Sequence, residues 1–112
     1  MWLITTRGFY SVVADHYEDG NVLVRARVRE DLESLADLIP ELEVEDTPER
    51  DYRFRASVPR EVWETAAAAL AEEIDYPNFK NAVADRQGSD RAHVYSDVWF
   101  TLLGLQEGGR YG

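Results

Sequence analysis

The chain has 112 residues, of which 45% are hydrophobic and 12% aromatic, and it carries a net charge of −10 at pH 7. Such a length normally gives one domain, and this hydrophobic content excludes a disordered chain because it offsets the loss of chain entropy. There is no cysteine, which excludes a disulfide framework, a thiolate zinc site and a cysteine nucleophile.

The N-terminal segment lacks a charged region followed by an apolar one, and no run approaches the ~18 apolar residues of a membrane helix. We therefore expect a cytoplasmic protein that does not enter a membrane. The negative charge opposes binding to nucleic acid, because phosphate contacts depend on an excess of Lys and Arg.

The first predicted elements form a β-hairpin. Residues 9–17 are rich in β-branched and aromatic side chains, a turn cluster follows at 18–21, and a second strand covers 22–28. In the second strand Val and Ala at the even positions alternate with Leu23, Arg25 and Arg27. This period of two predicts one apolar face and one face that carries arginines.

A helix is predicted next, over residues 30–39, with its apolar residues on one stripe and acidic residues in the first turn. Pro40 ends this helix. The acidic segment 41–51 follows, in which Leu42 and Val44 indicate either a short edge strand or a loop.

Residues 52–58 form the third predicted strand, in which Tyr52 and Phe54 alternate with Arg53 and Arg55. A strand, a helix and a strand in succession usually close as a right-handed parallel crossover. We therefore expect the strands at 22–28 and 52–58 to share one sheet, with their arginine faces on the same side.

Three helical segments complete the chain, at 59–75, 77–85 and 90–105, and residues 106–112 are expected to form a flexible tail. The order ββαβαα(α) predicts an α+β fold. We expect a small three- or four-stranded mixed sheet, built from a hairpin and a βαβ crossover, with helices on one face. Residues 1–112 are expected to form a single domain.

Charge is distributed unevenly along the chain. Residues 30–51 contain ten acidic residues and a single arginine, so that the remaining residues are almost neutral. Two binding surfaces follow from this segregation. One is the arginine face, and the other is the acidic segment; their candidate residues are Arg25, Arg27, Arg53 and Arg55 for the first, and Glu41, Glu43, Glu45 and Asp46 for the second.

The arginine face has a functional and a structural interpretation. Guanidinium groups match carboxylates and phosphates, which favours an anionic ligand. The alternative is that these arginines pair with carboxylates of the same chain and only solubilise the sheet. Base stacking is not expected, because Tyr52 and Phe54 are predicted on the opposite face.

The acidic segment also has two interpretations. It can mimic phosphates in the basic groove of a partner, or it can be a solvated helix and loop that keeps the protein soluble. Self-association of the basic face with the acidic segment of another copy would use both surfaces.

Catalytic candidates are few. Asp90, His93 and Asp97 have helical spacing and can share one face, as an acid–base pair or as metal ligands, but nothing else completes such a site. Lys80, the only lysine, is read as a solvated side chain. The sequence therefore predicts no catalytic residue, no metal site and no cofactor. Exposed Trp2 or Tyr111 would be hydrophobic anchors for a protein interface.

The segments MWLITTRGFYSVV, VLVRARVRE and IDYPNFKN together resemble small uncharacterised proteins of actinobacteria and their phages. The resemblance implies a GC-rich bacterial or phage origin and no particular activity. The function expected from the residues is a non-enzymatic protein-interaction module, such as a regulator or inhibitor that acts through its polarised surface. Anion or nucleic-acid binding by the arginine face is the alternative, and a small enzyme that uses His93 and Asp97 is the third interpretation.

Overall fold

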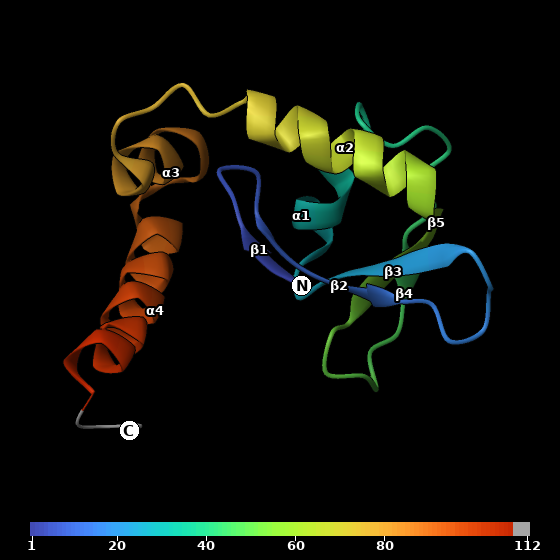
Figure 1. Cartoon of the computed structure of the whole chain (residues 1–112), viewed down its shortest axis with the longest axis horizontal. Helices are drawn as coiled ribbons and strands as arrows, with labels where there is room; N and C mark the ends of the chain where they lie inside the picture. The colour runs from blue at the N-terminus through green and yellow to red at the C-terminus, as the bar shows by residue number, and fades with distance from the viewer. Residues whose placement is uncertain (109–112) are drawn as a thin grey trace. The chain divides into compact units, whose positions relative to one another are not determined.

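A computed structural model describes residues 1–108 and divides the chain into two compact units, Met1–Asp75 and Tyr76–Gly112 (Figure 1). The first unit contains a sheet and two helices, and the second contains two helices. The α+β class predicted from the sequence is thereby confirmed. Residues 109–112 of the predicted tail lie outside the described residues, whereas residues 106 and 107 belong to the last helix.

The sheet has five antiparallel strands in the order β1-β2-β3-β5-β4. The predicted mixed sheet of three or four strands was therefore too small and wrong in strand direction. The sequence reasoning missed the N-terminal strand β1. The strands are β1 Trp2–Ile4, β2 Phe9–Ala14, β3 Asn21–Ala26, β4 Glu45–Asp46 and β5 Phe54–Pro59.

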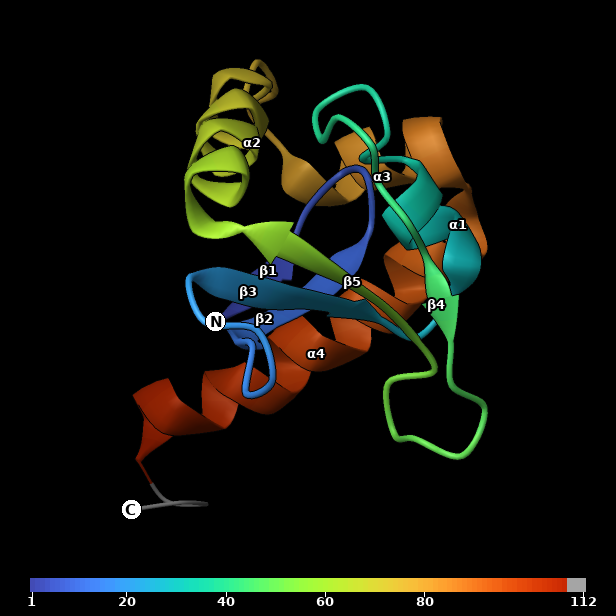
Figure 2. The same cartoon turned by 90° about the vertical axis from the view of Figure 1, so that its right-hand side faces the viewer.

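The expected parallel crossover between β3 and β5 does not form, and the two strands are antiparallel neighbours (Figure 2). Helix α1, predicted over 30–39, spans only Arg29–Glu33. At 1.5 Å per residue such a helix rises about 7 Å, whereas a six-residue strand spans about 20 Å. The connection therefore contains no full crossover helix; after α1 it continues through turns, and β5 runs back along β3.

The segment after α1 consists of turns. The Leu35 N–H donates to the Leu32 carbonyl oxygen, and the Leu38 N–H donates to the Leu35 carbonyl oxygen. Its predicted apolar stripe is nevertheless buried, because Leu32, Leu35 and Ile39 are all at most 1% exposed. Glu41, directly after Pro40, has a φ of 58°, which turns the chain towards β4. β4 settles the question left open for segment 41–46: only Glu45–Asp46 is strand, at the sheet edge.

Helix α2, Arg60–Glu72, begins at the residue that follows the end of β5, with no loop between the two. Pro59, predicted in the first turn of this helix, is instead the residue before it and the last residue of β5. Helices α1 and α2 both cover the same face of the sheet, which confirms that the helices of this unit lie on one side. The core between them consists of Tyr10, Val12, Val22, Val24, Ala26, Leu32, Leu35, Ile39, Ala56, Val58, Trp63 and Ala66.

The second unit pairs α3, Phe79–Gln87, with α4, Ser89–Glu107. The Asn78 side chain caps α3 by accepting a hydrogen bond from the Asn81 N–H at 2.9 Å. Gly88, with a φ of 96°, separates the two helices. The Phe79 and Tyr95 rings stack with centroids 6.1 Å apart, which joins the helices near their contact.

Candidate functional site

The candidate site lies on the sheet face opposite the core of the first unit. The β-ladder aligns one residue from each strand in a row, because Ser11 is opposite Arg25, and Arg25 is opposite Arg55. Cross-strand partners point to the same face of a sheet. Trp2 and Glu45 occupy the two ends of the row, opposite Ser11 and Arg55. The predicted meeting of arginines from the two strands therefore occurs, although the strands are antiparallel.

Arg25 is held by its neighbour on β2. Its Nη2 donates to the Ser11 hydroxyl at 2.7 Å, and its Nε lies 3.5 Å from the Ser11 carbonyl oxygen. Ser11 is itself buried, with 1% of its surface exposed. The guanidinium is thus held against the sheet by a neutral residue, Ser11. This contact leaves its positive charge without a compensating negative charge.

Tyr52 lies beneath two of the arginines. The guanidinium carbons of Arg25 and Arg27 are 4.6 and 4.3 Å from the centroid of its ring, which is the geometry of a cation–π contact. The sequence placed Tyr52 on the opposite face, and that prediction was wrong. The alternation of faces expected for residues 52–58 fails here because residues 52 and 53 precede β5. In this segment the N–H and the hydroxyl of Thr47 both donate to the Arg53 carbonyl oxygen.

Arg55 is the most buried of the group, with 9% of its surface exposed. Its Nη2 donates to the Tyr52 carbonyl oxygen at 3.0 Å, while its buried Nε has no hydrogen-bond partner within residues 1–108. None of Arg25, Arg27 and Arg55 forms an ion pair in this part of the chain. We refer to Ser11, Arg25, Arg27, Tyr52 and Arg55 as the arginine site.

Arg53 does not belong to this site. It forms an ion pair with Asp46, with the Nε and Oδ1 atoms 2.7 Å apart, and its guanidinium carbon lies 5.2 Å from the centroid of the Phe54 ring. The pair lowers the pKa of the Asp46 carboxyl, chiefly through the hydrogen bond from Arg53. One of the four predicted arginines and one of the four predicted acidic residues thus neutralise each other at the sheet edge.

The other three residues predicted for the acidic segment, Glu41, Glu43 and Glu45, are exposed. Glu45 is opposite Arg55 in the ladder, but no ion pair joins them. Elsewhere in residues 30–51 the charge is partly compensated, since Glu33 pairs with Arg29 and Asp37 pairs with Arg7. The separation of positive and negative charge is therefore smaller than the number of charged residues in the sequence predicts.

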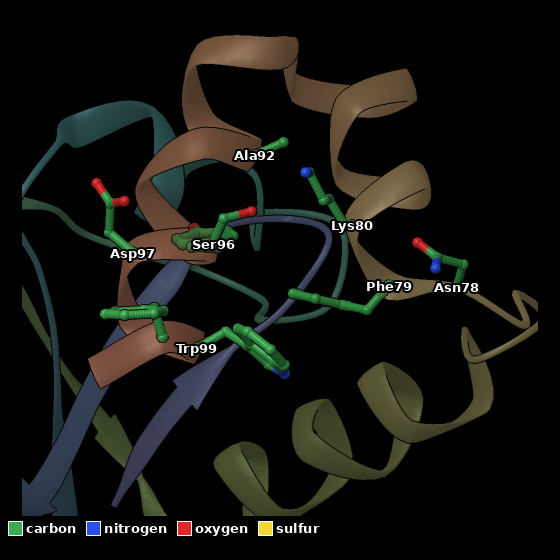
Figure 3. A pocket seen from close by; sticks show the side chains of 9 residues that line it. Asn78, Phe79, Lys80, Ala92, Ser96, Asp97 and Trp99 are labelled. Atoms are coloured by element: carbon green, nitrogen blue, oxygen red, sulfur yellow. The ribbon is translucent and has the colours of Figure 1, made fainter. Parts of the chain in front are cut away.

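The second unit contains a pocket of about 620 Å³ between α3 and α4 (Figure 3). Lys80 and Asp97 line it together with aromatic residues, whereas His93, also on α4, is exposed and does not line it. Asp90, His93 and Asp97 do share one helix, as predicted, but they do not converge on this pocket. Its lining consists of Asn78, Phe79, Lys80, Ala92, Tyr95, Ser96, Asp97, Trp99 and Phe100.

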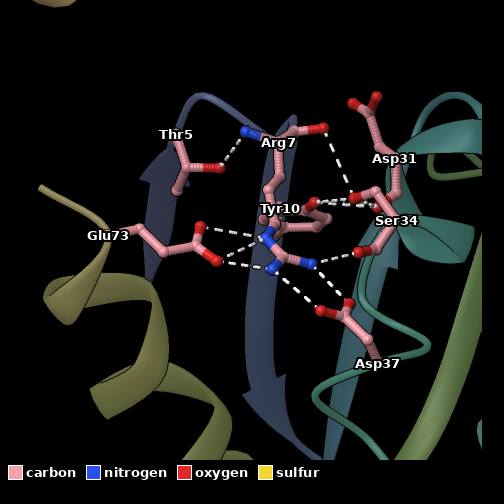
Figure 4. A network of polar contacts seen from close by, with 7 residues as sticks. All are labelled: Thr5, Arg7, Tyr10, Asp31, Ser34, Asp37 and Glu73. Atoms are coloured by element: carbon pink, nitrogen blue, oxygen red, sulfur yellow. Dashed lines mark hydrogen bonds and ion pairs between the residues drawn. The ribbon is translucent and has the colours of Figure 1, made fainter. Parts of the chain in front are cut away.

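A charged cluster that sequence reasoning missed surrounds Arg7, which is 8% exposed (Figure 4). Its guanidinium binds Glu73 at 2.5 Å and Asp37 at 2.6 Å, and it also donates to the Ser34 carbonyl oxygen. The hydrogen bonds to Glu73 and then to Asp37 raise the pKa of Arg7 further above its ordinary range. The guanidinium thus donates to groups in two other segments of the same chain. Arg7 therefore links the β1–β2 loop to the turn after α1 and to the end of α2.

Of the predicted hydrophobic anchors, Trp2 is 73% exposed and lies at the edge strand, while Tyr111 is outside the described residues. Within residues 1–108 no cluster of three or more potential ligands could hold a metal ion. No helix in that range has the length and apolar character to cross a membrane. A scan against models of protein families, a search of curated proteins and a search of solved structures gave no match.

Proposed function

We propose that this chain is a small non-enzymatic interaction module that binds an anionic group of a protein partner at the arginine site. The observation that carries the proposal is the cross-strand position of Arg25 and Arg55, neither of which pairs with a carboxylate within residues 1–108. Like charges placed directly opposite each other destabilise a sheet. An external anion would relieve that repulsion, so binding at this position has a built-in driving force.

The hydrogen-bond geometry supports a carboxylate or phosphate as the recognised group. A guanidinium has five N–H donors. Arg27 uses one of them for the Asp51 carbonyl oxygen, at 2.7 Å, and Arg25 is oriented by Ser11. Contact with the Tyr52 ring restricts both side chains further, which reduces the entropy lost when a ligand binds.

A protein partner is favoured over a nucleic acid by two observations. Tyr52 lies on the arginine side, but it is only 5% exposed, so its ring is covered by the arginines and cannot stack on a base. The net charge of −10 also opposes a long polyanion, whose phosphates would extend beyond the arginines. A single acidic side chain or a short acidic segment avoids that repulsion.

The test is an NMR titration of the arginine Nε–H signals with an octaglutamate peptide at low and moderate salt. We expect saturable shifts of the Arg25 and Arg27 signals that weaken as salt is added. The double variant R25Q/R27Q should lose at least tenfold in affinity. R60Q changes the charge of an exposed arginine at the start of α2, and it should bind as the original chain does.

The variant E45Q sharpens the test, because Glu45 is the acidic neighbour of Arg55 in the ladder. Removing its charge should raise the affinity for the peptide. Absence of saturable shifts in the original chain would overturn the proposal. Shifts that occur only with a single-stranded oligothymidylate would replace the protein partner with a nucleic acid.

A further inference from the structure

Trp2 exposes an aromatic ring beside the arginine site. It occupies one end of the cross-strand row, opposite Ser11, and 73% of its surface is exposed. Because Ser11 is in turn opposite Arg25, all three side chains lie on the same face of the sheet. Both helices of the first unit cover the other face, so they leave the Trp2 ring uncovered.

Aromatic contacts connect Trp2 to the arginine site. Its ring meets the Phe9 ring edge-on, with the two centroids 5.8 Å apart. The Phe9 centroid in turn lies 6.3 Å from the centroid of Tyr52. Tyr52 is the ring that the guanidinium groups of Arg25 and Arg27 cover. A single exposed hydrophobic residue needs no explanation. The Trp2 ring, however, is continuous with a group of arginines.

The residue types of this surface are those that dominate the binding energy of protein interfaces. Trp, Tyr and Arg are enriched among the interface residues whose truncation costs the most affinity. We propose that Trp2 and Phe9 extend the arginine site, so that it recognises an extended acidic segment of a partner that also carries an apolar residue. The inference rests on the proposed function, because the acidic residues of that segment bind the arginines. The apolar residue packs on the Trp2 ring.

The two ends of the cross-strand row differ in charge, which orients the bound segment. Glu45, at the end opposite to Trp2, is exposed and forms no ion pair within residues 1–108. Its charge repels an acidic ligand from that end. The other end consists of Ser11 and Trp2, which carry no charge. An acidic segment that contacts Arg25 therefore extends towards Trp2.

The strand spacing sets the spacing of the two residue types in the ligand. Trp2 and Arg25 lie two strands apart, which separates their backbones by about 10 Å. The Arg25 guanidinium reaches back towards β2 and contacts the Ser11 hydroxyl, so its charge lies about 5–10 Å from the Trp2 backbone. Alternate residues of an extended segment point to the same side and are about 7 Å apart. An apolar residue two positions from an acidic residue fits this separation.

The test compares octaglutamate with the peptide EEEFEEEE, by fluorescence anisotropy of the labelled peptides with the full chain. The second peptide has one negative charge fewer, so a purely electrostatic site would bind it no more tightly. We expect it to bind about fivefold more tightly, because its ring pairs with an aromatic ring on the protein. In NMR spectra the Trp2 indole N–H signal should shift with EEEFEEEE and much less with octaglutamate.

The variant W2A separates the apolar contact from the ionic one. It should bind octaglutamate as the original chain does, but it should lose the preference for EEEFEEEE. Trp2 is largely exposed, so W2A should keep the circular dichroism of the original chain. The matched control is W99A, which removes a tryptophan that is 66% exposed on α4 of the second unit. W99A should keep the preference.

Two peptides of equal charge test the predicted spacing. EEQFQEEE keeps a glutamate two positions from the phenylalanine on each side, whereas EQEFEQEE replaces those two glutamates and keeps the adjacent ones. We expect EEQFQEEE to bind more tightly. Equal affinities, or the reverse order, would contradict the spacing.

The outcomes distinguish this inference from the function on which it rests. Failure of octaglutamate to bind would overturn both. Binding of octaglutamate without a preference for EEEFEEEE, or a preference that survives in W2A, would overturn the role of Trp2 alone. A Trp2 signal that moves with protein concentration in the absence of peptide would assign the ring to contact with a second copy, and it would overturn that role as well.

Discussion

Arg25 and Arg55 occupy directly opposite positions on β3 and β5, and within residues 1–108 neither is neutralised by a carboxylate. Arg7, by contrast, is buried to a similar extent as Arg55 but lies between Asp37 and Glu73. The same side chain therefore has two roles in one small unit. Arg7 holds three segments together, whereas Arg55 donates to the Tyr52 carbonyl oxygen and has no carboxylate partner within residues 1–108.

Replacing each of these buried arginines by methionine should separate the two roles. R7M removes the hydrogen bonds that Arg7 donates to Asp37, Glu73 and the Ser34 carbonyl oxygen, and it should lower the free energy of unfolding by about 2–4 kcal/mol. R55M removes an unpaired Nε and keeps the apolar volume, so the change should stay within about 1 kcal/mol. Urea denaturation of the two variants checks this, and an equal loss in both would contradict the distinction.

Gly8 should not tolerate a side chain. A Cβ built on Gly8 would lie 2.4 Å from the Asp31 Cγ, and Asp31 is buried, with its Oδ2 accepting the Phe9 N–H. G8A should therefore cost about 1–3 kcal/mol through overpacking.

The control for this substitution is G20N. Nothing lies within 4 Å of a Cβ built on Gly20, and Asn tolerates its φ of 83° better than most residues do. The melting temperature of G20N should stay close to that of the original chain, while that of G8A should fall by several degrees.

Asp15 should make stability depend on acid pH. Its carboxyl accepts hydrogen bonds from Ser57, Tyr17 N–H and Glu18 N–H, and these bonds lower its pKa below the ordinary value of 3.8. A lowered folded-state pKa means that the stabilisation is complete well above pH 3.8 and is lost as the pH falls through the folded-state value.

The variant D15N measures that contribution. The stability difference between the original chain and D15N should be largest near neutral pH and should shrink below pH 3.8. Denaturation at a series of pH values checks the sign. A difference that grows as the pH falls would contradict it. S57A removes the strongest of the three hydrogen bonds and should raise the pKa of Asp15 in an NMR titration.

Glu41 should be a site where stability can be gained. Its φ of 58° is in the left-handed region, which costs an ordinary residue about 1 kcal/mol and Asn less. E41N should therefore raise the free energy of unfolding by several tenths of a kcal/mol. E43N removes the same charge from a nearby exposed residue and should change it little. Equal gains in both variants would assign the effect to charge instead of to the backbone.

Local pattern was enough to predict the elements whose apolar periodicity is strong. The alternation of Val22 and Val24 with Arg25 identified β3 and its two faces, and Pro59 marked the start of α2. Strand direction could not be read in this way, because it depends on the path of the whole connection between β3 and β5, including the turn at Glu41. The sequence favours a helix beyond Glu33, but the chain forms turns there. These turns still bury Leu35 and Ile39.

The alternation of residues along regular strands also predicted part of the candidate site. Period two correctly placed Arg25 and Arg55 on one side, since both lie inside regular strands. It failed for Tyr52 and Arg53, which precede β5 and follow the turn geometry set by Thr47. The Arg7 cluster carries no local signal at all, because Glu73 is distant in sequence and is brought near only by the folded α2.

The direct junction of β5 and α2 has a mechanical consequence. No flexible residue separates Pro59 from Arg60, so a tilt of β5 rotates α2 as a rigid lever about 20 Å long. Glu73, at the far end of that lever, forms an ion pair with Arg7. If the ligand proposed above shifts Arg55 and β5, the movement would reach the β1–β2 loop through α2 and the ion pair between Glu73 and Arg7.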